Sequence, residues 1–164
     1  KAEYYDERED KERLMKLCRA SCSMPLLTPV VKLDGIPYLD GGLADSVPIE
    51  RAKTYGNSKI VVILTRNRGY RKKSVSKGLA KLYKKAYCSY PNLVRTILLR
   101  SLYYNRTMNH IERLEREGKI FVLRPEIKPV SRLERNPDTL MGFYNHGHEL
   151  MEQEQGRLME YLEI

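Results

Sequence analysis

The sequence predicts an α/β fold with a mostly parallel sheet, and three observations support this prediction. Residues 59–64 form an apolar, β-branched stretch, and residues 119–124 form a second one. Such runs, bounded by turn residues, are typical of strands buried on both faces of a parallel sheet. The intervening residues have helical patterns of apolar side chains, so helices and strands alternate along the chain, as in an α/β fold.

The N-terminal third predicts a helix and then a hairpin. Residues 1–17 place opposite charges three and four positions apart, which favours a helix. Residues 19–29 contain small residues and two prolines, so we expect an irregular turn there. Asp34 and Gly35 separate two short apolar runs, and an Asp-Gly pair in this position predicts a tight hairpin.

The hairpin delivers a carboxylate, Asp40, to a loop that continues with Gly41 and Gly42. Glycines tolerate backbone angles that a side chain forbids, and they leave room for other groups to approach the carboxylate closely. Asp-Gly-Gly alone is more often a simple turn, so the tripeptide needs the surrounding sequence to suggest a function.

The remaining elements follow from apolar periodicity and from helix start and stop signals. In chain order, we expect a short helix at residues 48–55, a strand at 59–64, a basic amphipathic helix within 68–85, a helix at 92–117, a strand at 119–124 and a last helical segment from residue 136. Gly147 lies inside this last segment, and we expect a kink or a break near it.

The positive charge is concentrated in one region. Residues 51–111 contain 15 Lys or Arg and no Asp or Glu, whereas the rest of the chain has 15 basic and 21 acidic side chains. This asymmetry suggests a surface that faces a polyanion such as an anionic membrane, although a solvated charged face is an equally good interpretation. No nucleic-acid-binding motif is present, so we expect no specific nucleic-acid partner.

Neither a metal nor another cofactor is predicted. Cys18, Cys22 and Cys88 have no zinc or redox spacing, and we interpret them as structural thiols in a reducing cytoplasm. His146 and His148 are two positions apart and therefore point to different faces of a helix. The longest apolar runs are too short to cross a bilayer, so we expect a cytoplasmic protein that is at most peripheral at the membrane.

Several short motifs occur in order between residues 19 and 48, and together they resemble the second half of a patatin-like phospholipase domain. The motifs are Arg19-Ala20-Ser21, Met24-Pro25, Pro29-Val30, Asp34-Gly35, Leu39-Asp40-Gly41-Gly42 and Asp45-Ser46-Val47-Pro48. The resemblance is good over residues 19–65. It implies a three-layer α/β/α domain and the serine-dependent hydrolysis of an acyl ester, usually of a lipid.

The resemblance assigns Asp40 as the acid of a Ser-Asp dyad, with Gly41 and Gly42 supporting it. This family needs a Gly-x-Ser-x-Gly elbow and a glycine-rich oxyanion loop before the Asp motif, and the sequence has neither. We therefore expect these residues to be the C-terminal portion of a longer protein, inactive without the N-terminal half. An exposed sheet edge would then favour that half or a second copy as a partner.

Two further expectations concern the rest of the chain. Residues 1–67 are assigned to the patatin-like catalytic domain, and residues 68–164 to a basic helical region with one strand and C-terminal helices that pack on it. Candidate contacts to phosphate or to a membrane are Arg66, Arg68, Arg71, Lys72 and Lys73. The alternative function is a non-enzymatic module that binds polyanions or membranes through residues 51–111.

Overall fold

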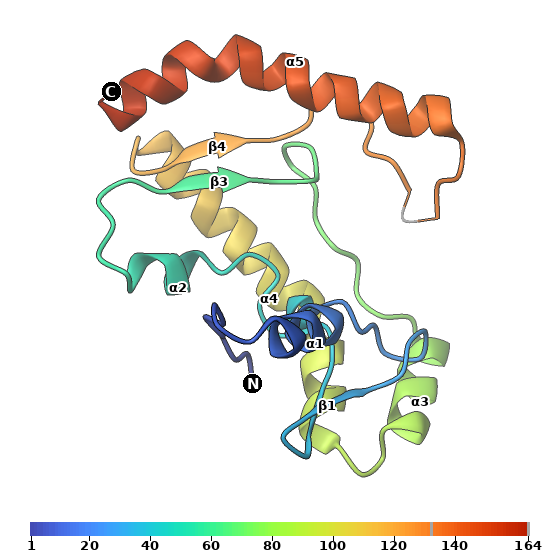
Figure 1. Cartoon of the computed structure of the whole chain (residues 1–164). Helices are drawn as coiled ribbons and strands as arrows, with labels where there is room; N and C mark the ends of the chain where they lie inside the picture. The colour runs from blue at the N-terminus through green and yellow to red at the C-terminus, as the bar shows by residue number, and fades with distance from the viewer. Residues whose placement is uncertain (132, 164) are drawn as a thin grey trace. The chain divides into compact units, whose positions relative to one another are not determined.

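The computed structural model describes residues 1–131 and 133–163, which form two compact units. Unit 1 contains Lys1–Pro48 and Lys72–Thr107, and unit 2 contains Ile49–Arg71 and Met108–Ile164. The elements in Figure 1 are α1 (Lys11–Ser21), β1 (Val31–Leu33), β2 (Ile36–Tyr38), the 3₁₀ turn η1 (Gly41–Leu43), α2 (Ile49–Lys53), β3 (Val61–Ile63), α3 (Lys77–Ala86), α4 (Pro91–Arg116), β4 (Phe121–Leu123) and α5 (Pro137–Leu162). Helices around two small sheets are consistent with an α/β domain. The domain division after residue 67 stays a prediction.

Helix α1 begins later than the charge pattern predicts. Asp10 is its N-cap in an extended conformation, and the Asp10 carboxylate accepts a hydrogen bond of 2.9 Å from the backbone N–H of Arg13. This cap fixes the helix start, and residues 1–10 are not helical. The prediction of a helix over residues 1–10 is therefore wrong. Asp10 caps the free backbone N–H groups of the first turn, and a capping residue lies just before the helix that it caps.

The hairpin in unit 1 agrees with the prediction. Strands β1 and β2 pair antiparallel, with Leu33 opposite Ile36. Asp34 and Gly35 form the turn with φ angles of +51° and +79°, which is the left-handed pair that a two-residue hairpin requires. Leu33 is buried, so the hairpin anchors to unit 1 through one strand.

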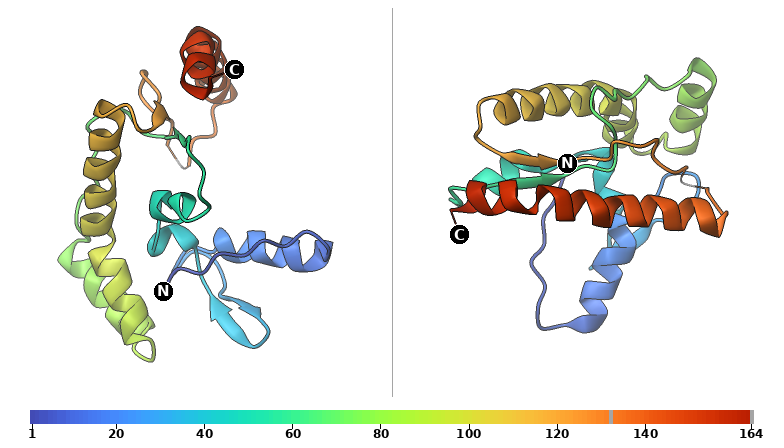
Figure 2. Two further views of the ribbon diagram at one scale, coloured as in Figure 1. Left: turned by 90° about the vertical axis from the view of Figure 1, so that its left-hand side faces the viewer. Right: turned by 90° about the horizontal axis from the view of Figure 1, so that it is seen from above.

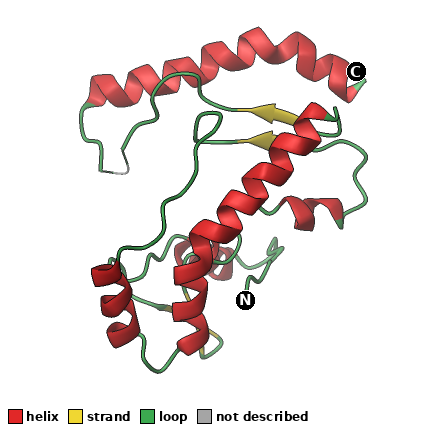
Figure 3. Cartoon of the chain, turned by 180° about the vertical axis from the view of Figure 1, so that it is seen from behind, coloured by secondary structure: helices red, strands yellow, loops and turns green. Residues whose placement is uncertain are grey.

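Helix α4 is one uninterrupted helix of 26 residues, and Figure 3 shows its whole length. The buried side chains recur every three or four residues, as a single buried stripe requires. Those in unit 1 are Val94, Ile97, Ser101 and Tyr104, and those in unit 2 are Met108, Ile111 and Leu114. Its observed bounds differ from the predicted ones by one residue at each end.

The strands β3 and β4 of unit 2 pair in parallel, with Val62 opposite Val122, and Figure 2 shows α5 running beside them. Phe121 and Leu123 are buried, but Val61 and Ile63 are 38% and 74% exposed on the same face. The prediction that residues 59–64 are buried on both faces is therefore wrong for the described chain. The reason is that α5 packs on β4, and among the described residues β4 is the only strand that pairs with β3.

Helix α5 is continuous, so the break that Gly147 predicts is absent. A glycine in a helix interior costs about 1 kcal/mol relative to alanine, and contacts near the C-terminal end help to offset this cost. The Tyr161 hydroxyl accepts a hydrogen bond of 3.0 Å from the backbone N–H of Ile60, and the Tyr161 ring lies 5.8 Å from that of Phe121. Among the described residues, no helix combines the length and low polarity needed to cross a membrane.

Candidate active site

The carboxylate of Asp40 is held in a fixed orientation directly after the hairpin. Asp40 caps the turn η1, and its Oδ1 atom accepts a hydrogen bond of 2.7 Å from the backbone N–H of Gly42. The backbone N–H of Asp40 donates to the carbonyl oxygen of Ser23, also at 2.7 Å. Ser23 is buried, so the loop is fixed to the interior of unit 1. Oδ2 of Asp40 has no hydrogen-bond partner among residues 1–131 and 133–163, which leaves one oxygen able to accept a proton.

The two glycines after Asp40 differ in their surroundings. A Cβ atom added to Gly42 would lie 3.0 Å from Oδ1 of Asp40, whereas one added to Gly41 would meet only the Ser21 Oγ atom, at 3.8 Å. Neither glycine has a positive φ angle. The expectation that both are needed for special backbone angles is therefore wrong. A close approach to the carboxylate is seen at Gly42.

Two cationic side chains, Arg100 and Lys72, lie beside this loop, and only Lys72 was among the predicted contacts. The carbonyl oxygen of Gly42 accepts hydrogen bonds from Nε of Arg100, at 2.8 Å, and from Oγ of Ser46, at 2.7 Å. Nζ of Lys72 lies 3.2 Å from the same Oγ atom and 3.9 Å from the centre of the Tyr104 ring. Arg100 lies three residues after the buried Ile97 on α4, and a basic residue beside a buried stripe is the only signal that could have indicated it.

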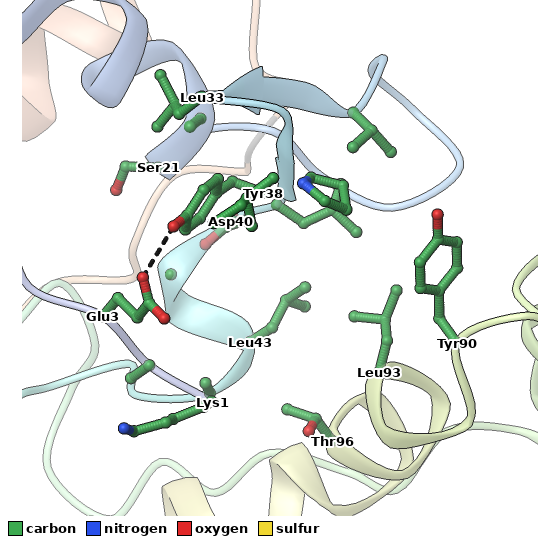
Figure 4. Close-up of a pocket in the computed structure, with 18 of the residues that line it drawn as sticks. Lys1, Glu3, Ser21, Leu33, Tyr38, Asp40, Leu43, Tyr90, Leu93 and Thr96 are labelled. Atoms are coloured by element: carbon green, nitrogen blue, oxygen red, sulfur yellow. Dashed lines mark hydrogen bonds between the residues drawn. The ribbon is translucent and has the colours of Figure 1, made fainter. Parts of the chain in front are cut away.

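Asp40 lies in the wall of a pocket of about 460 Å³, and Figure 4 shows most of the residues that line it. All of the lining residues belong to unit 1. The apolar side chains among them are Ala2, Leu17, Ala20, Val30, Leu33, Ile36, Pro37, Leu39, Leu43, Ala44 and Leu93. A pocket of this size with mostly apolar walls and a few polar groups is typical of a small-molecule or cofactor site. An acyl chain fits these walls chemically.

The N-terminal segment contributes a polar cluster to the same pocket. The Glu3 carboxylate accepts hydrogen bonds from the hydroxyls of Tyr5, at 2.7 Å, and Tyr38, at 2.8 Å, and the second of these is drawn in Figure 4. The hydrogen bond from Tyr5 is the main reason why the pKa of Glu3 lies below its usual value. The pKa of Tyr5 is raised, first by its hydrogen bond with Tyr38 and then by Glu3. The Tyr4 hydroxyl donates to Asp45 at 2.5 Å, so this segment is tied to both sides of the Asp40 loop.

Three of the predicted phosphate contacts belong to unit 2 and do not line the pocket described here. The Arg66 guanidinium lies 5.2 Å from the centre of the Tyr70 ring. Arg68 forms a salt bridge with Glu115 at 2.7 Å, and Arg71 forms a bidentate salt bridge with Glu112 at 2.7 and 3.0 Å. The positive charges of Arg68 and Arg71 are thus each paired with a carboxylate of α4. Their role as phosphate contacts stays a prediction.

The other two predicted contacts, Lys72 and Lys73, belong to unit 1, as Asp40 does. The backbone N–H of Lys72 donates to the side-chain oxygen of Asn105 at 2.8 Å, and Asn105 donates back to the Lys72 carbonyl at 3.1 Å. This reciprocal pair fixes the segment beside α4. Lys73 is exposed.

The described residues contain no group of three or more His, Cys, Asp or Glu side chains that could hold a metal ion. His110 lies 2.8 Å from Nζ of Lys53, and the backbone N–H of Glu126 donates to His146 at 3.0 Å. Each of these imidazoles therefore has an ordinary hydrogen-bonding role. Cys18, Cys22 and Cys88 are free and exposed, and their interpretation as structural thiols in a reducing cytoplasm stays a prediction.

Two family models match different parts of the chain. The model described as patatin-like phospholipase matches residues 1–53, and a domain of unknown function (DUF6363) matches residues 90–163. The first match contains Asp40 and supports the resemblance to patatin-like phospholipases over that segment. The match covers about a third of the chain.

One similar protein carries no functional description in its name. The chain is 39% identical over 56 residues to the uncharacterized protein YjjU of Escherichia coli (strain K12). The matched stretch covers 34% of this chain and 16% of that relative. The chain therefore spans a small part of the relative's length.

Proposed function

We propose that this chain supplies the acid of a Ser-Asp dyad in a patatin-like acyl hydrolase that acts on a phospholipid or a related acyl ester. The observation that carries the proposal is the position of Asp40. Its carboxylate lies in the wall of an apolar pocket of about 460 Å³, and one of its oxygens is held by the Gly42 N–H at 2.7 Å. An acid beside an acyl-sized apolar pocket is what ester hydrolysis without a histidine requires.

The role of Asp40 in this proposal is to move one proton. Its Oδ2 atom accepts the proton of a serine hydroxyl while the serine oxygen attacks the ester carbonyl carbon. Backbone N–H groups stabilise the resulting oxyanion. The protonated acid then gives the proton to the leaving alcohol, and an acyl-serine remains. Water attacks this acyl group while Asp40 accepts its proton. Asp40 then returns the proton to the departing serine oxygen, which releases the free acid and restores the serine hydroxyl and the Asp40 carboxylate.

The serine and the oxyanion donors lie outside these 164 residues in this proposal. Ser21 is the only serine that lines the pocket among the described residues. It is the last residue of α1, whereas a nucleophile elbow is a sharp turn from a strand into a helix. The partner that completes the site is then the N-terminal half of the same three-layer α/β/α domain, and the free edge of β3 is a place where a further strand could pair.

The experiment measures hydrolysis of p-nitrophenyl esters of increasing acyl length by the full-length protein that contains this chain. Asp40→Asn keeps the shape and hydrogen-bonding size of the side chain but cannot accept the proton, so we expect turnover to fall by a factor of about 10³ or more. Asp34→Asn is the matched control, because Asp34 lies in the exposed hairpin turn. Ser21→Ala should leave turnover within about twofold. Loss of activity in Ser21→Ala, with normal activity in Asp40→Asn, would contradict the proposal.

A second candidate function is a non-enzymatic module that binds polyanions or membranes. It is favoured by residues 72–107 of unit 1, which contain nine basic side chains and no Asp or Glu. This candidate predicts that the full-length protein has no esterase activity but binds acidic vesicles in a salt-dependent manner. The ester assay therefore distinguishes the two candidates.

A further inference from the structure

Helix α3 divides its side chains into two opposite faces. Leu79, Leu82, Tyr83 and Ala86 are spaced three and four residues apart and share one face. The other face carries Lys77, Lys81, Lys84 and Lys85. Ser76 caps the helix, since its hydroxyl accepts from the backbone N–H of Leu79 at 3.4 Å. The apolar face therefore belongs to a helix with a defined beginning.

The apolar face of α3 is only partly covered by the rest of unit 1, since Tyr83 is half-buried. No residue of α3 is buried, and Leu79 and Leu82 are 39% and 49% exposed. On α4, the corresponding stripe is buried, with Ile97 only 3% exposed. An amphipathic helix normally buries its apolar face, so α3 has a face that is suited to another apolar environment.

The charge around α3 selects an anionic environment. The four lysines have no ion pair with any carboxylate of the described chain. Residues 72–107 contain no acidic residue that could neutralise them. A surface with unpaired lysines beside exposed leucines is complementary to a lipid bilayer that has negative head groups and an apolar interior.

The C-terminal end of α3 reaches the pocket that contains Asp40. Tyr87, the residue after α3, accepts a hydrogen bond of 3.0 Å from the backbone N–H of Leu26, and Tyr87 and Tyr90 both line the pocket. Leu26 and Leu27 are 40% and 74% exposed. Figure 1 shows their loop beside α3. Exposed leucines and a tyrosine thus continue the apolar surface from α3 to the wall of the pocket.

We propose that α3, the Leu26–Leu27 turn and Tyr90 lie in the head-group region of an anionic phospholipid bilayer. The leucines enter the boundary of the acyl chains, the tyrosines remain at the polar level, and the lysines attract the negative head groups. This placement brings the bilayer to the pocket. The delivery of a lipid to Asp40 rests on the proposed function, whereas the binding itself does not.

A bilayer fits these observations better than a nucleic acid does. Nucleic-acid surfaces are recognised by basic side chains together with stacked aromatic rings. The face of α3 opposite its lysines instead exposes two leucines, Leu79 and Leu82, beside a single tyrosine. Leucines on the binding surface contribute to membrane affinity and contribute nothing to phosphate contacts.

The test is co-sedimentation of the full-length protein with vesicles of phosphatidylcholine and phosphatidylglycerol, and with vesicles of phosphatidylcholine alone. We expect binding to the mixed vesicles that weakens as salt is added. Lys81→Ala with Lys84→Ala should lower the partition coefficient about 30-fold. Lys11→Ala with Lys16→Ala removes the same charge from exposed positions on α1 and should change it less than about threefold.

A second pair of variants tests the apolar face. The double variant Leu79→Ser and Leu82→Ser should lower the partition coefficient onto the mixed vesicles about tenfold or more. The control double variant Leu14→Ser and Met15→Ser changes two exposed residues of α1 and should not lower the partition coefficient to that extent. Equal effects of the α1 and α3 pairs, or tighter binding to duplex DNA than to the mixed vesicles, would overturn the proposal. Circular dichroism checks that each variant is folded, and the lysine pair remains informative if the serine pair unfolds.

A soluble ester separates this inference from the proposed function. The α3 variants should hydrolyse a short, water-soluble ester at the unaltered rate and lose activity only on vesicle lipid. If the protein has no esterase activity but binds the mixed vesicles through α3, the hydrolase proposal fails and the membrane inference stands. Esterase activity without vesicle binding would overturn the membrane inference alone.

Discussion

Nε of Arg100 donates a hydrogen bond of 2.8 Å to the carbonyl oxygen of Gly42, two residues after the candidate acid Asp40. Gly42 lies in the segment that matches patatin-like phospholipases, and Arg100 lies in the segment that matches the domain of unknown function. The hydrogen bond is partly buried. The N-terminal part of α4 is therefore part of the structure that holds the Asp40 loop, and the second matched segment is not merely appended to the first.

The first prediction follows from this hydrogen bond. Arg100→Ala leaves the Gly42 carbonyl with Ser46 as its remaining side-chain donor, so the Asp40 loop should lose its fixed position. Because a shift of about 1 Å at a reacting group can lower the rate about 100-fold, we expect kcat for a soluble ester to fall 10- to 100-fold, with KM little changed.

Arg95→Ala is the control for Arg100, because Arg95 is an exposed arginine on the same helix. It should leave kcat unchanged. Arg100→Lys keeps the positive charge but cannot reproduce the planar guanidinium, and it should recover part of the lost rate. Equal kcat values for Arg100→Ala and Arg95→Ala would show that the hydrogen bond to Gly42 does not position Asp40.

The second prediction compares the two glycines of the motif. In Gly42→Ala the new methyl group would lie 3.0 Å from Oδ1 of Asp40, whereas in Gly41→Ala its nearest neighbour is the Ser21 Oγ atom at 3.8 Å. Neither position has a positive φ angle, so the backbone tolerates alanine at both. We expect Gly42→Ala to lower kcat at least tenfold and Gly41→Ala to lower it less than threefold. Reversed effects in steady-state assays would contradict the observed orientation of Asp40.

The third prediction concerns the N-terminal segment beside the pocket. Tyr38→Phe removes a hydroxyl that lies 2.8 Å from Glu3 and 2.6 Å from the Tyr5 hydroxyl. The segment should then open more often, and proteolytic cleavage within residues 1–9 should become faster by about 3- to 10-fold. Tyr55→Phe is the control, because Tyr55 is exposed in unit 2. The same cleavage rate in both variants would show that the cluster does not hold the segment.

The fourth prediction is a dependence of stability on pH. The hydrogen bonds from Arg71 lower the pKa of Glu112. A carboxyl group whose pKa is lower in the folded protein than in the unfolded chain stabilises the folded state at pH values above the unfolded pKa of about 4.3. That stabilisation is lost as the pH falls through the lowered value. Glu112→Gln should therefore reduce the free energy of unfolding at pH 7 by about 0.5–1 kcal/mol, since the pair is only partly buried.

Urea denaturation at a series of pH values measures this effect. The difference between the unaltered protein and Glu112→Gln should be constant near neutral pH and should decrease toward zero in acid. Glu9→Gln is the control, because Glu9 is exposed and its carboxylate has no partner among the described residues. A difference that grows as the pH falls would have the wrong sign for the Arg71–Glu112 pair.

Local patterns in the sequence were sufficient for several elements of the fold. Asp34 and Gly35 predicted the hairpin because few residue pairs accept two positive φ angles in succession. The apolar spacing along α4 predicted a helix, because a helix with one buried face must repeat that spacing. Pro91 and Gly118, as start and stop signals, predicted its bounds to within one residue. Asp40 was assigned through the order of several motifs, and the structure places it in a pocket wall.

Interactions between distant residues could not be predicted in the same way. Arg100 is 58 residues from Gly42, and nothing in the residues around Arg100 indicates which carbonyl it contacts. The strand at Val61 and Ile63 was expected to be buried because its composition is apolar. Composition shows what a strand can bury but not what covers it, and α5 packs on the neighbouring strand β4 instead.

The most direct test of the account is the rate at which a fluorophosphonate labels the full-length protein. Labelling needs a serine whose proton is accepted by a base, and it does not depend on the choice of substrate. We expect one labelled serine outside these 164 residues, and a labelling rate that falls by a factor of about 10³ in Asp40→Asn while Asp34→Asn is labelled normally. Unaltered labelling of Asp40→Asn would contradict the assignment of Asp40 as the catalytic base.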